Sequence, residues 1–111
     1  MEWKKIVEEK ELDKIIEESK SHPVLIFKHS TRCSVSSTAL SRLERSWVSE
    51  EMKNVSPYFL DLLSYRNISN LISETFKINH ESPQALLIKD GNVVYHASHL
   101  GISYSEIKKM C

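Results

Sequence analysis

Apolar residues follow two different periods along the chain, and each change of period predicts a new element. Residues 10–21 place three large apolar side chains on one face and charges elsewhere, which predicts a short amphipathic helix. The run 24–27 that follows is continuously apolar, as in a strand buried on both faces of a sheet. Pro23 stands directly before this run, where a proline can open a strand.

From Cys33 onward the apolar residues recur every four positions, which predicts a helix of about 15 residues with a broad core-facing stripe. A predicted strand at 57–63 and a second amphipathic helix at 66–77 come next. Two further strands, 84–89 and 92–98, are joined by an Asp-Gly pair. This pair predicts a hairpin because glycine adopts a positive φ without steric cost.

The last predicted helix covers 103–110 and opens with a capping box, in which Ser103 stands three residues before Glu106. A short edge strand is predicted around 3–7. The resulting order is (β)αβαβαββα, in which the alternating first part favours parallel crossovers and the end is an antiparallel hairpin followed by a helix. We therefore predict an α/β fold: a mixed four- or five-stranded sheet with helices on both faces.

Composition narrows the class of protein. The length indicates one domain, residues 1–111, and the 41% hydrophobic and 27% charged content is ordinary for a globular chain. Lysine plus arginine and aspartate plus glutamate number 15 each, so the chain lacks the basic excess typical of nucleic-acid or anionic-membrane binding. No apolar run approaches the roughly 20 residues of a membrane span, and the charged N-terminus does not fit a signal peptide. We expect a cytoplasmic protein with neither nucleic-acid nor membrane partners.

The two cysteines, Cys33 and Cys111, lie far apart in the sequence. In a reducing compartment such thiols are free or catalytic rather than paired as a structural disulfide. Cys33 stands where a buried strand passes into a long helix, so unpaired backbone N–H groups and the positive end of the helix dipole converge on it. Because the thiolate is the nucleophilic form of cysteine, this position and its polar neighbours predict a reactive thiol.

The side chains around Cys33 are candidates for supporting its chemistry. Arg32 and His29 would add positive charge beside a thiolate, and His29 would thereby tune its ionisation. Ser36 occupies the place of the resolving thiol in a Cys-x-x-Cys pair, so no local disulfide can close there. Its hydroxyl is a candidate donor to the Cys33 sulfur, although an ordinary first-turn serine fits equally well. The candidate substrate-binding residues are Arg32, Ser34, Ser36, Ser82 and Pro83.

Pro83 stands immediately before the predicted strand at 84–89. Taken alone, it is typical of a trans proline that opens a strand, since cis bonds are a minority of X–Pro bonds. A cis Ser82–Pro83 bond would instead free the backbone of Ser82 to pair with an extended segment of a substrate.

Taken together, these features resemble the thioredoxin fold: a buried strand, a cysteine that opens a helix, a βαβ unit, and a proline that leads into a hairpin and a last helix. The stretches FKHSTRCSVSS, YRNISN, HESPQALLIKDG and VVYHASH are similar to the monothiol bacilliredoxins of the YtxJ type, which belong to the bacillithiol system of Gram-positive bacteria. The resemblance covers nearly all of the chain after residue 10. It identifies Cys33 as the redox cysteine and Ser82–Pro83 as the cis-proline bond of the fold.

The resemblance implies a thiol–disulfide oxidoreductase that removes bacillithiol from mixed disulfides on proteins. Cys33 would attack the bacillithiol sulfur, the target protein would leave as a thiol, and a second thiol from solution would regenerate Cys33. The implied partners are bacillithiolated proteins, with bacillithiol as co-substrate and no tightly bound cofactor. We expect the protein to be a monomer.

Other functions stay open at this point. Cys111 would act as a resolving thiol if the C-terminal helix moved toward Cys33. A non-catalytic thioredoxin-like interaction module would use the groove near Ser82–Pro83 without the thiol. An iron–sulfur module is disfavoured because the Cys-Gly-Phe-Ser motif of monothiol glutaredoxins is absent. A metal site built from a cysteine with His80, His96 or His99 is disfavoured as well.

Overall fold

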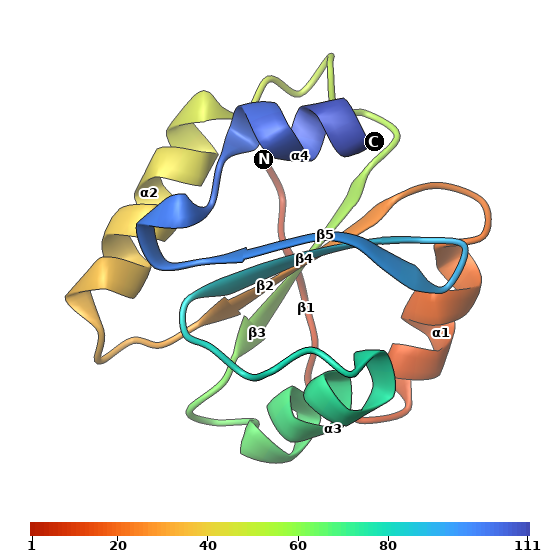
Figure 1. Ribbon diagram of the computed structural model, residues 1–111, viewed down its shortest axis with the longest axis vertical. Helices are drawn as coiled ribbons and strands as arrows, with labels where there is room; N and C mark the ends of the chain where they lie inside the picture. The colour runs from red at the N-terminus through yellow and green to blue at the C-terminus, as the bar shows by residue number, and fades with distance from the viewer.

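The computed structural model describes residues 1–111 and shows a five-stranded mixed sheet in the order β1-β3-β2-β4-β5 (Figure 1). The strands are β1 (Lys4–Lys5), β2 (Val24–His29), β3 (Ser56–Asp61), β4 (Gln84–Lys89) and β5 (Asn92–Ser98). The helices are α1 (Glu11–Glu18), α2 (Ser34–Ser46), α3 (Arg66–Phe76) and α4 (Tyr104–Met110), with a 3-10 turn η1 (His99–Gly101) before α4. The predicted element order is confirmed, and the sheet has five strands rather than four.

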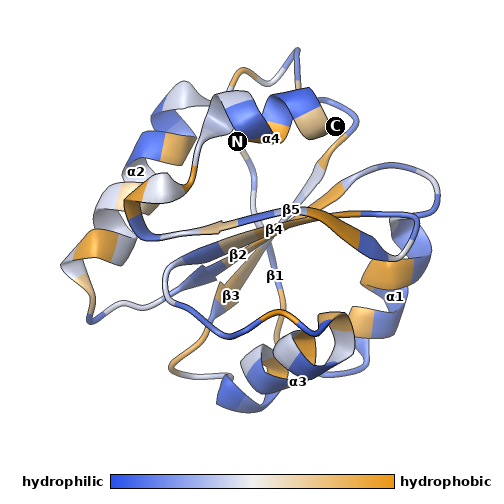
Figure 2. Ribbon diagram, in the orientation of Figure 1, coloured by the Kyte–Doolittle hydropathy of each residue, from blue (hydrophilic) through white to orange (hydrophobic).

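Two layers of helices cover the two faces of the sheet: α1 and α3 lie on one face, and α2 and α4 lie on the other (Figure 1). Strand β2 runs through the centre of the sheet, and all six of its residues are buried. Its side chains alternate, so Val24 and Ile26 pack with α1 and α3, whereas Leu25 and Phe27 pack with α2 and α4. Figure 2 shows hydrophobic residues along the sheet and on the helices beside it. The continuously apolar run was thus a valid signal for a strand buried on both faces.

Strand directions bring three segments to one edge of the sheet. Strand β2 is parallel to β3, with His29 beside Asp61 at their carboxyl ends. It is antiparallel to β4, with Lys28 beside Gln84, so β4 begins where β2 ends. The start of α2, the loop after β3 and the residues that precede β4 therefore share this edge. In α/β sheets the carboxyl ends of the parallel strands are where binding sites form.

Element boundaries differ from the predicted ones where a polar side chain ends an element. The predicted strand 57–63 ends at Asp61, whose carboxylate accepts the backbone N–H groups of Leu63 and Ser64 and turns the chain. The predicted helix 10–21 is shorter, and the Ser19 hydroxyl bonds to a carbonyl of its last turn. Strand β1 is shorter than the predicted stretch 3–7.

None of the helices combines the length and the apolar composition that a membrane crossing requires.

Candidate functional site

Cys33 is the N-cap residue of α2, at the edge of the sheet where β2 ends. Its backbone is extended (φ −111°, ψ 117°), and its carbonyl accepts the first bond of the helix, from the N–H of Ser37 at 3.2 Å. Its own N–H bonds to the carbonyl of Ser30 at 3.2 Å, which closes the turn between strand and helix. The side chain is partly exposed and unpaired. The thiol therefore lies beside the unsatisfied N–H groups and positive dipole end of a 13-residue helix.

A buried hydrogen-bond network lies beneath this turn. The Ser36 side chain is fully buried, and its Oγ accepts the backbone N–H of Ser30 at 3.0 Å. The same Oγ lies 2.7 Å from Nδ1 of His29. The alternative that Ser36 donates to the Cys33 sulfur is wrong in this structure, because the hydroxyl is bonded to His29 and Ser30 instead. Ser36 thus fixes the turn that presents the thiol.

His29 is a buried member of this network, and its surroundings favour the neutral ring over a cation. Burial lowers the pKa of His29, and the charges of Asp61 and Glu44 oppose this only in part. Nδ1 of His29 and the Ser36 hydroxyl form one hydrogen bond, which occupies Nδ1 and holds the ring within the network. The lowered pKa of His29 argues against the expectation that this residue adds positive charge near Cys33. Arg32 is the remaining cationic residue next to Cys33 in the sequence. Its side chain is exposed and forms no ion pair.

The Ser82–Pro83 bond is cis, as the resemblance implied, and it precedes β4 at the edge where β2 ends. Pro83 is buried, and its carbonyl accepts the N–H of His99 at 3.0 Å. The backbone N–H and C=O of Ser82 take part in no hydrogen bond, and its buried hydroxyl has no partner either. Ser82 thus leaves donor and acceptor groups available at the same edge of the sheet as Cys33.

The turn η1 also belongs to this region, although none of the predicted site residues lies in it. The bond from His99 to Pro83 places η1 beside the proline, and the next residue, Leu100, is the most exposed large apolar side chain of the protein. The signal for this turn in the sequence was a leucine within a short polar stretch that follows a predicted strand. Ser34, also predicted at the site, lies exposed in the first turn of α2.

Cys111 lies at the opposite end of the sheet from Cys33. Its thiol donates to the carbonyl of Ile107 at 3.1 Å, and the neighbouring Met110 carbonyl accepts a bond from Lys89 at 3.4 Å. Lys89 ends β4, whereas the site lies at the start of β4, about 16 Å away along the strand. Burial raises the pKa of Cys111, and the charge of Lys89 opposes this in part. This arrangement argues against Cys111 as a resolving thiol.

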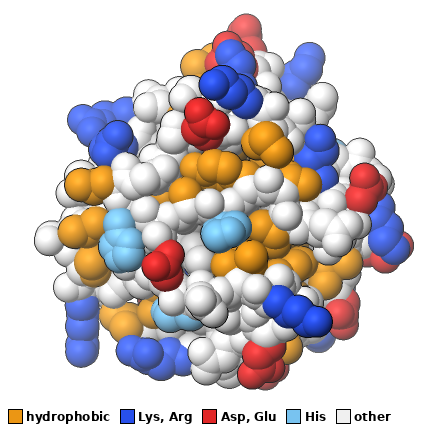
Figure 3. All heavy atoms as spheres, viewed as in Figure 1, with side chains coloured by type: hydrophobic (Ala, Val, Ile, Leu, Met, Phe, Trp, Pro, Cys, Tyr) orange, Lys and Arg blue, Asp and Glu red, His pale blue; other side chains and the backbone are white.

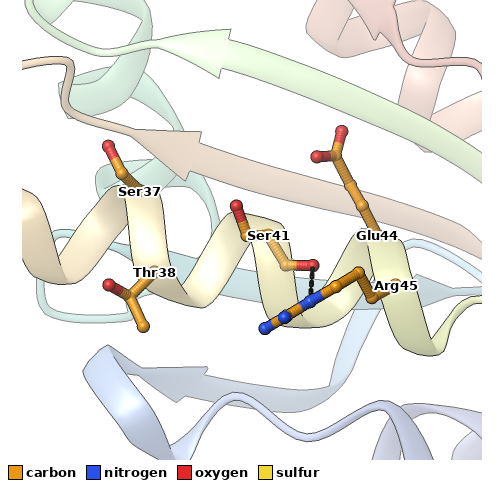
Figure 4. A pocket seen from close by; sticks show the side chains of 5 residues that line it. All are labelled: Ser37, Thr38, Ser41, Glu44 and Arg45. Atoms are coloured by element: carbon orange, nitrogen blue, oxygen red, sulfur yellow. Dashed lines mark hydrogen bonds between the residues drawn. The ribbon is translucent and has the colours of Figure 1, made fainter.

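A surface hollow runs along the outer face of α2. It has a volume of about 540 Å³ and is lined by Ser37, Thr38, Ser41, Glu44 and Arg45 (Figure 4). Both of its ionic side chains already form hydrogen bonds within the protein. Glu44 accepts the indole N–H of Trp3, and Arg45 donates to the Ser41 carbonyl. No hydrophobic residue lines the hollow, so it lacks the character of an enclosed ligand pocket.

No group of three or more His, Cys, Asp or Glu side chains gathers where it could hold a metal ion. The histidine side chains visible in Figure 3 lie apart from one another on that face.

One protein family and several solved structures are similar to this chain. The model of the family described as monothiol bacilliredoxin BrxC matches residues 4–107. A solved structure described as having a thioredoxin fold shares 27% identity with this chain, with a TM-score of 0.81 over 96% of this chain and 90% of that chain. Thioredoxin from Malassezia sympodialis shares 14% identity, with a TM-score of 0.75 over 97% of this chain and 86% of its own.

Mitochondrial thioredoxin 3 of Saccharomyces cerevisiae is a third similar structure, with 18% identity and a TM-score of 0.69 over 96% of this chain and 91% of its own. The fold is therefore the thioredoxin fold, and the predicted fold class is confirmed.

Proposed function

Because the chain belongs to the monothiol bacilliredoxin family, we propose that it is a thiol–disulfide oxidoreductase that removes bacillithiol from mixed disulfides on proteins. The family and the thioredoxin fold support the oxidoreductase role. The substrate and the monothiol route are the proposal. One observation carries the route: Cys33 begins α2 with its thiol unpaired, while a buried serine holds the place of a resolving cysteine.

In the first step the Cys33 thiolate attacks the bacillithiol sulfur of the mixed disulfide. A Cys33–bacillithiol disulfide forms, the original S–S bond breaks, and the target cysteine leaves as a thiolate that takes a proton from solvent. The first turn of α2 stabilises negative charge on the attacking sulfur through its unpaired N–H groups. Ser36 contributes by holding the turn rigid through Ser30 and His29.

In the second step a thiol from solution resolves the enzyme. A bacillithiol thiolate attacks the bacillithiol sulfur on Cys33, which releases bacillithiol disulfide and returns the Cys33 thiolate. The two electrons that reduce the target protein thus come from two bacillithiol molecules. Cys111 has no part in this route, which agrees with its position at the far end of the sheet.

The substrate is held on either side of the thiol. Ser82 offers an unpaired N–H and C=O, which suit an extended segment that carries the disulfide. Arg32 and Ser34 lie exposed on the α2 side, where they can meet polar groups of bacillithiol. We propose that one chain acts as a monomer in the cytoplasm, with bacillithiol as a diffusible co-substrate.

A turnover assay with a bacillithiolated protein and free bacillithiol tests this function. Wild type and Cys111→Ser should release the target thiol at equal rates, and Cys33→Ser should release none above the uncatalysed rate. Equal activity of Cys33→Ser and wild type would refute the catalytic role and favour a non-catalytic interaction module. Loss of activity in Cys111→Ser would favour the two-cysteine route.

A further inference from the structure

Lys28 is a fully buried lysine without a carboxylate partner. It lies in β2 and points to the face covered by α3, where its Nζ donates to the carbonyl of Ser69 at 3.1 Å. Its second contact is with Nδ1 of His80, at 3.3 Å. Burying an ammonium group away from a counter-charge destabilises a fold. An apolar side chain of similar length would fill the same space without that cost, so the lysine calls for a role beyond packing.

The contact with His80 ties β2 to the segment 77–83, which joins α3 to β4. Nδ1 of His80 also lies 3.1 Å from the hydroxyl of Ser69. An ammonium group donates only, so Nδ1 must be the acceptor and the ring proton must sit on Nε2. Burial and the charges of Lys28 and Arg66 lower the pKa of His80, whereas Glu81 raises it, and the net effect keeps the ring neutral.

Other bonds fix the segment up to His80, and the next one comes only after the cis bond, where the Pro83 carbonyl accepts the N–H of His99. The Ser73 hydroxyl donates to the carbonyl of Ile78, and the Gln84 amide donates to the carbonyl of Asn79. Glu81 and Ser82 form no hydrogen bond, as judged from all bonds of the chain. The contacts of His80 with Lys28 and with Ser69 are therefore the last anchors before Ser82, and the contact with Lys28 is the one that carries charge.

We propose that Lys28 is a positioning residue that, by holding His80, sets the place of Ser82 and Pro83 relative to Cys33 and so determines the affinity for the disulfide substrate. This inference rests on the proposed function. The same strand, β2, supports both halves of the site: it leads to Cys33 through its carboxyl end and holds the proline segment through Lys28. The two halves are thereby fixed to one rigid element.

Protonation of His80 removes this anchor. The ring then has no lone pair on Nδ1, and two cations face each other. The charged groups around the contact are Lys28 on β2, His80 and Glu81 on the segment, and Arg66 on α3, so three of the four are cationic when His80 is protonated. Substrate affinity should therefore fall in acid, and the fall should depend on the lysine.

Lys28→Met tests the proposal, with His80→Asn and His80→Leu as a matched pair. Methionine fills the lysine volume without the charge. The KM for a bacillithiolated protein should rise roughly tenfold, as expected for loss of one charged hydrogen bond. The kcat and the rate of Cys33 alkylation by iodoacetamide should stay within about twofold, since the thiol itself is untouched. His80→Asn, whose Oδ1 can stand in for Nδ1, should keep the wild-type KM, and His80→Leu should match Lys28→Met.

Two further readouts separate positioning from stability. The Tm of Lys28→Met should equal or exceed that of wild type, because a buried unpaired charge is removed. NMR order parameters of residues 80–82 should fall in Lys28→Met and stay at wild-type values in His80→Asn. An unchanged KM together with unchanged order parameters would overturn the proposal, as would equal effects of His80→Asn and His80→Leu. If wild type fails to act on bacillithiolated proteins, the proposed function fails, and the order parameters still decide whether Lys28 holds the segment.

Discussion

Nδ1 of His29 lies 2.7 Å from Oγ of Ser36, and this contact joins the last residue of β2 to the first turn of α2. Cys33 lies between the two, and the Ser30 N–H bonds to the same serine oxygen at 3.0 Å. The hydrogen bonds among His29, Ser30 and Ser36 thus hold the turn that carries the Cys33 thiol. In a dithiol protein a second cysteine would occupy the position of Ser36. Here Ser36 holds the turn that carries Cys33, and it cannot form a disulfide with that thiol.

Ser36→Ala should destabilise the protein, because it leaves the buried N–H of Ser30 and Nδ1 of His29 without partners. The expected loss in free energy of unfolding is about 1–3 kcal/mol, the usual effect of a buried polar group left unsatisfied. Urea denaturation measures it. Ser37→Ala, at an exposed position of the same helix, is the control and should change stability by less than about 0.5 kcal/mol. Equal effects of the two substitutions would show that the network contributes nothing.

His29 should make stability depend on pH below neutrality. Because burial lowers the pKa of His29, the unfolded chain binds a proton before the folded chain does as the pH falls below about 6.5. Wild type should therefore lose stability in acid relative to His29→Asn, which keeps an acceptor for Ser36 and does not titrate. Urea denaturation at pH 7.5, 6 and 5 measures the difference between the two proteins. Parallel pH profiles would contradict the neutral buried state of His29.

The two cysteines should differ in reactivity toward iodoacetamide at pH 7. Burial raises the pKa of Cys111, so its thiolate is scarce, whereas Cys33 lies at the positive end of α2. We expect Cys33 to react roughly tenfold faster or more, measured separately in Cys111→Ser and Cys33→Ser. Slower alkylation of Cys33 than of Cys111 would argue that the helix start does not activate the thiol.

Lys28 should make the protein more stable at alkaline pH. Burial lowers the pKa of Lys28 from 10.5 to about 8. Between these values the unfolded chain binds a proton that the folded chain lacks, so stability rises with pH across this window. The gain in the free energy of unfolding of wild type between pH 7.5 and pH 10, relative to Lys28→Met, should be on the order of 2–3 kcal/mol. Lys53→Met, at an exposed position, is the control and should give a flat difference. A flat difference for Lys28→Met as well would show that the buried ammonium does not lose its proton in this range.

Much of the fold follows from local patterns in the sequence. The hairpin strands 84–89 and 92–98 match the structure because an apolar run, an Asp-Gly turn and a second β-rich run each have one favoured conformation. The position of Cys33 was also predictable, since the change from a continuous apolar run to a four-residue period marks the start of a helix. Both signals depend only on residues near in sequence.

The contacts of polar side chains could not be predicted in the same way. Ser36 had the Cys33 sulfur and His29 within reach along the chain, and the choice between them depends on how α2 packs on β2. The predicted strand stopped at Phe27, whereas β2 continues through Lys28, which is buried because α3 presents the Ser69 carbonyl to it. No sequence pattern shows that a distant helix supplies such an acceptor.

The most direct test of the central claim is mass spectrometry of the protein quenched in acid while it reacts with a bacillithiolated target. We predict a single bacillithiol on the peptide that contains Cys33, in wild type and in Cys111→Ser alike, which disappears when free bacillithiol is added. A disulfide between Cys33 and Cys111, or release of the target thiol with no adduct at Cys33, would contradict it.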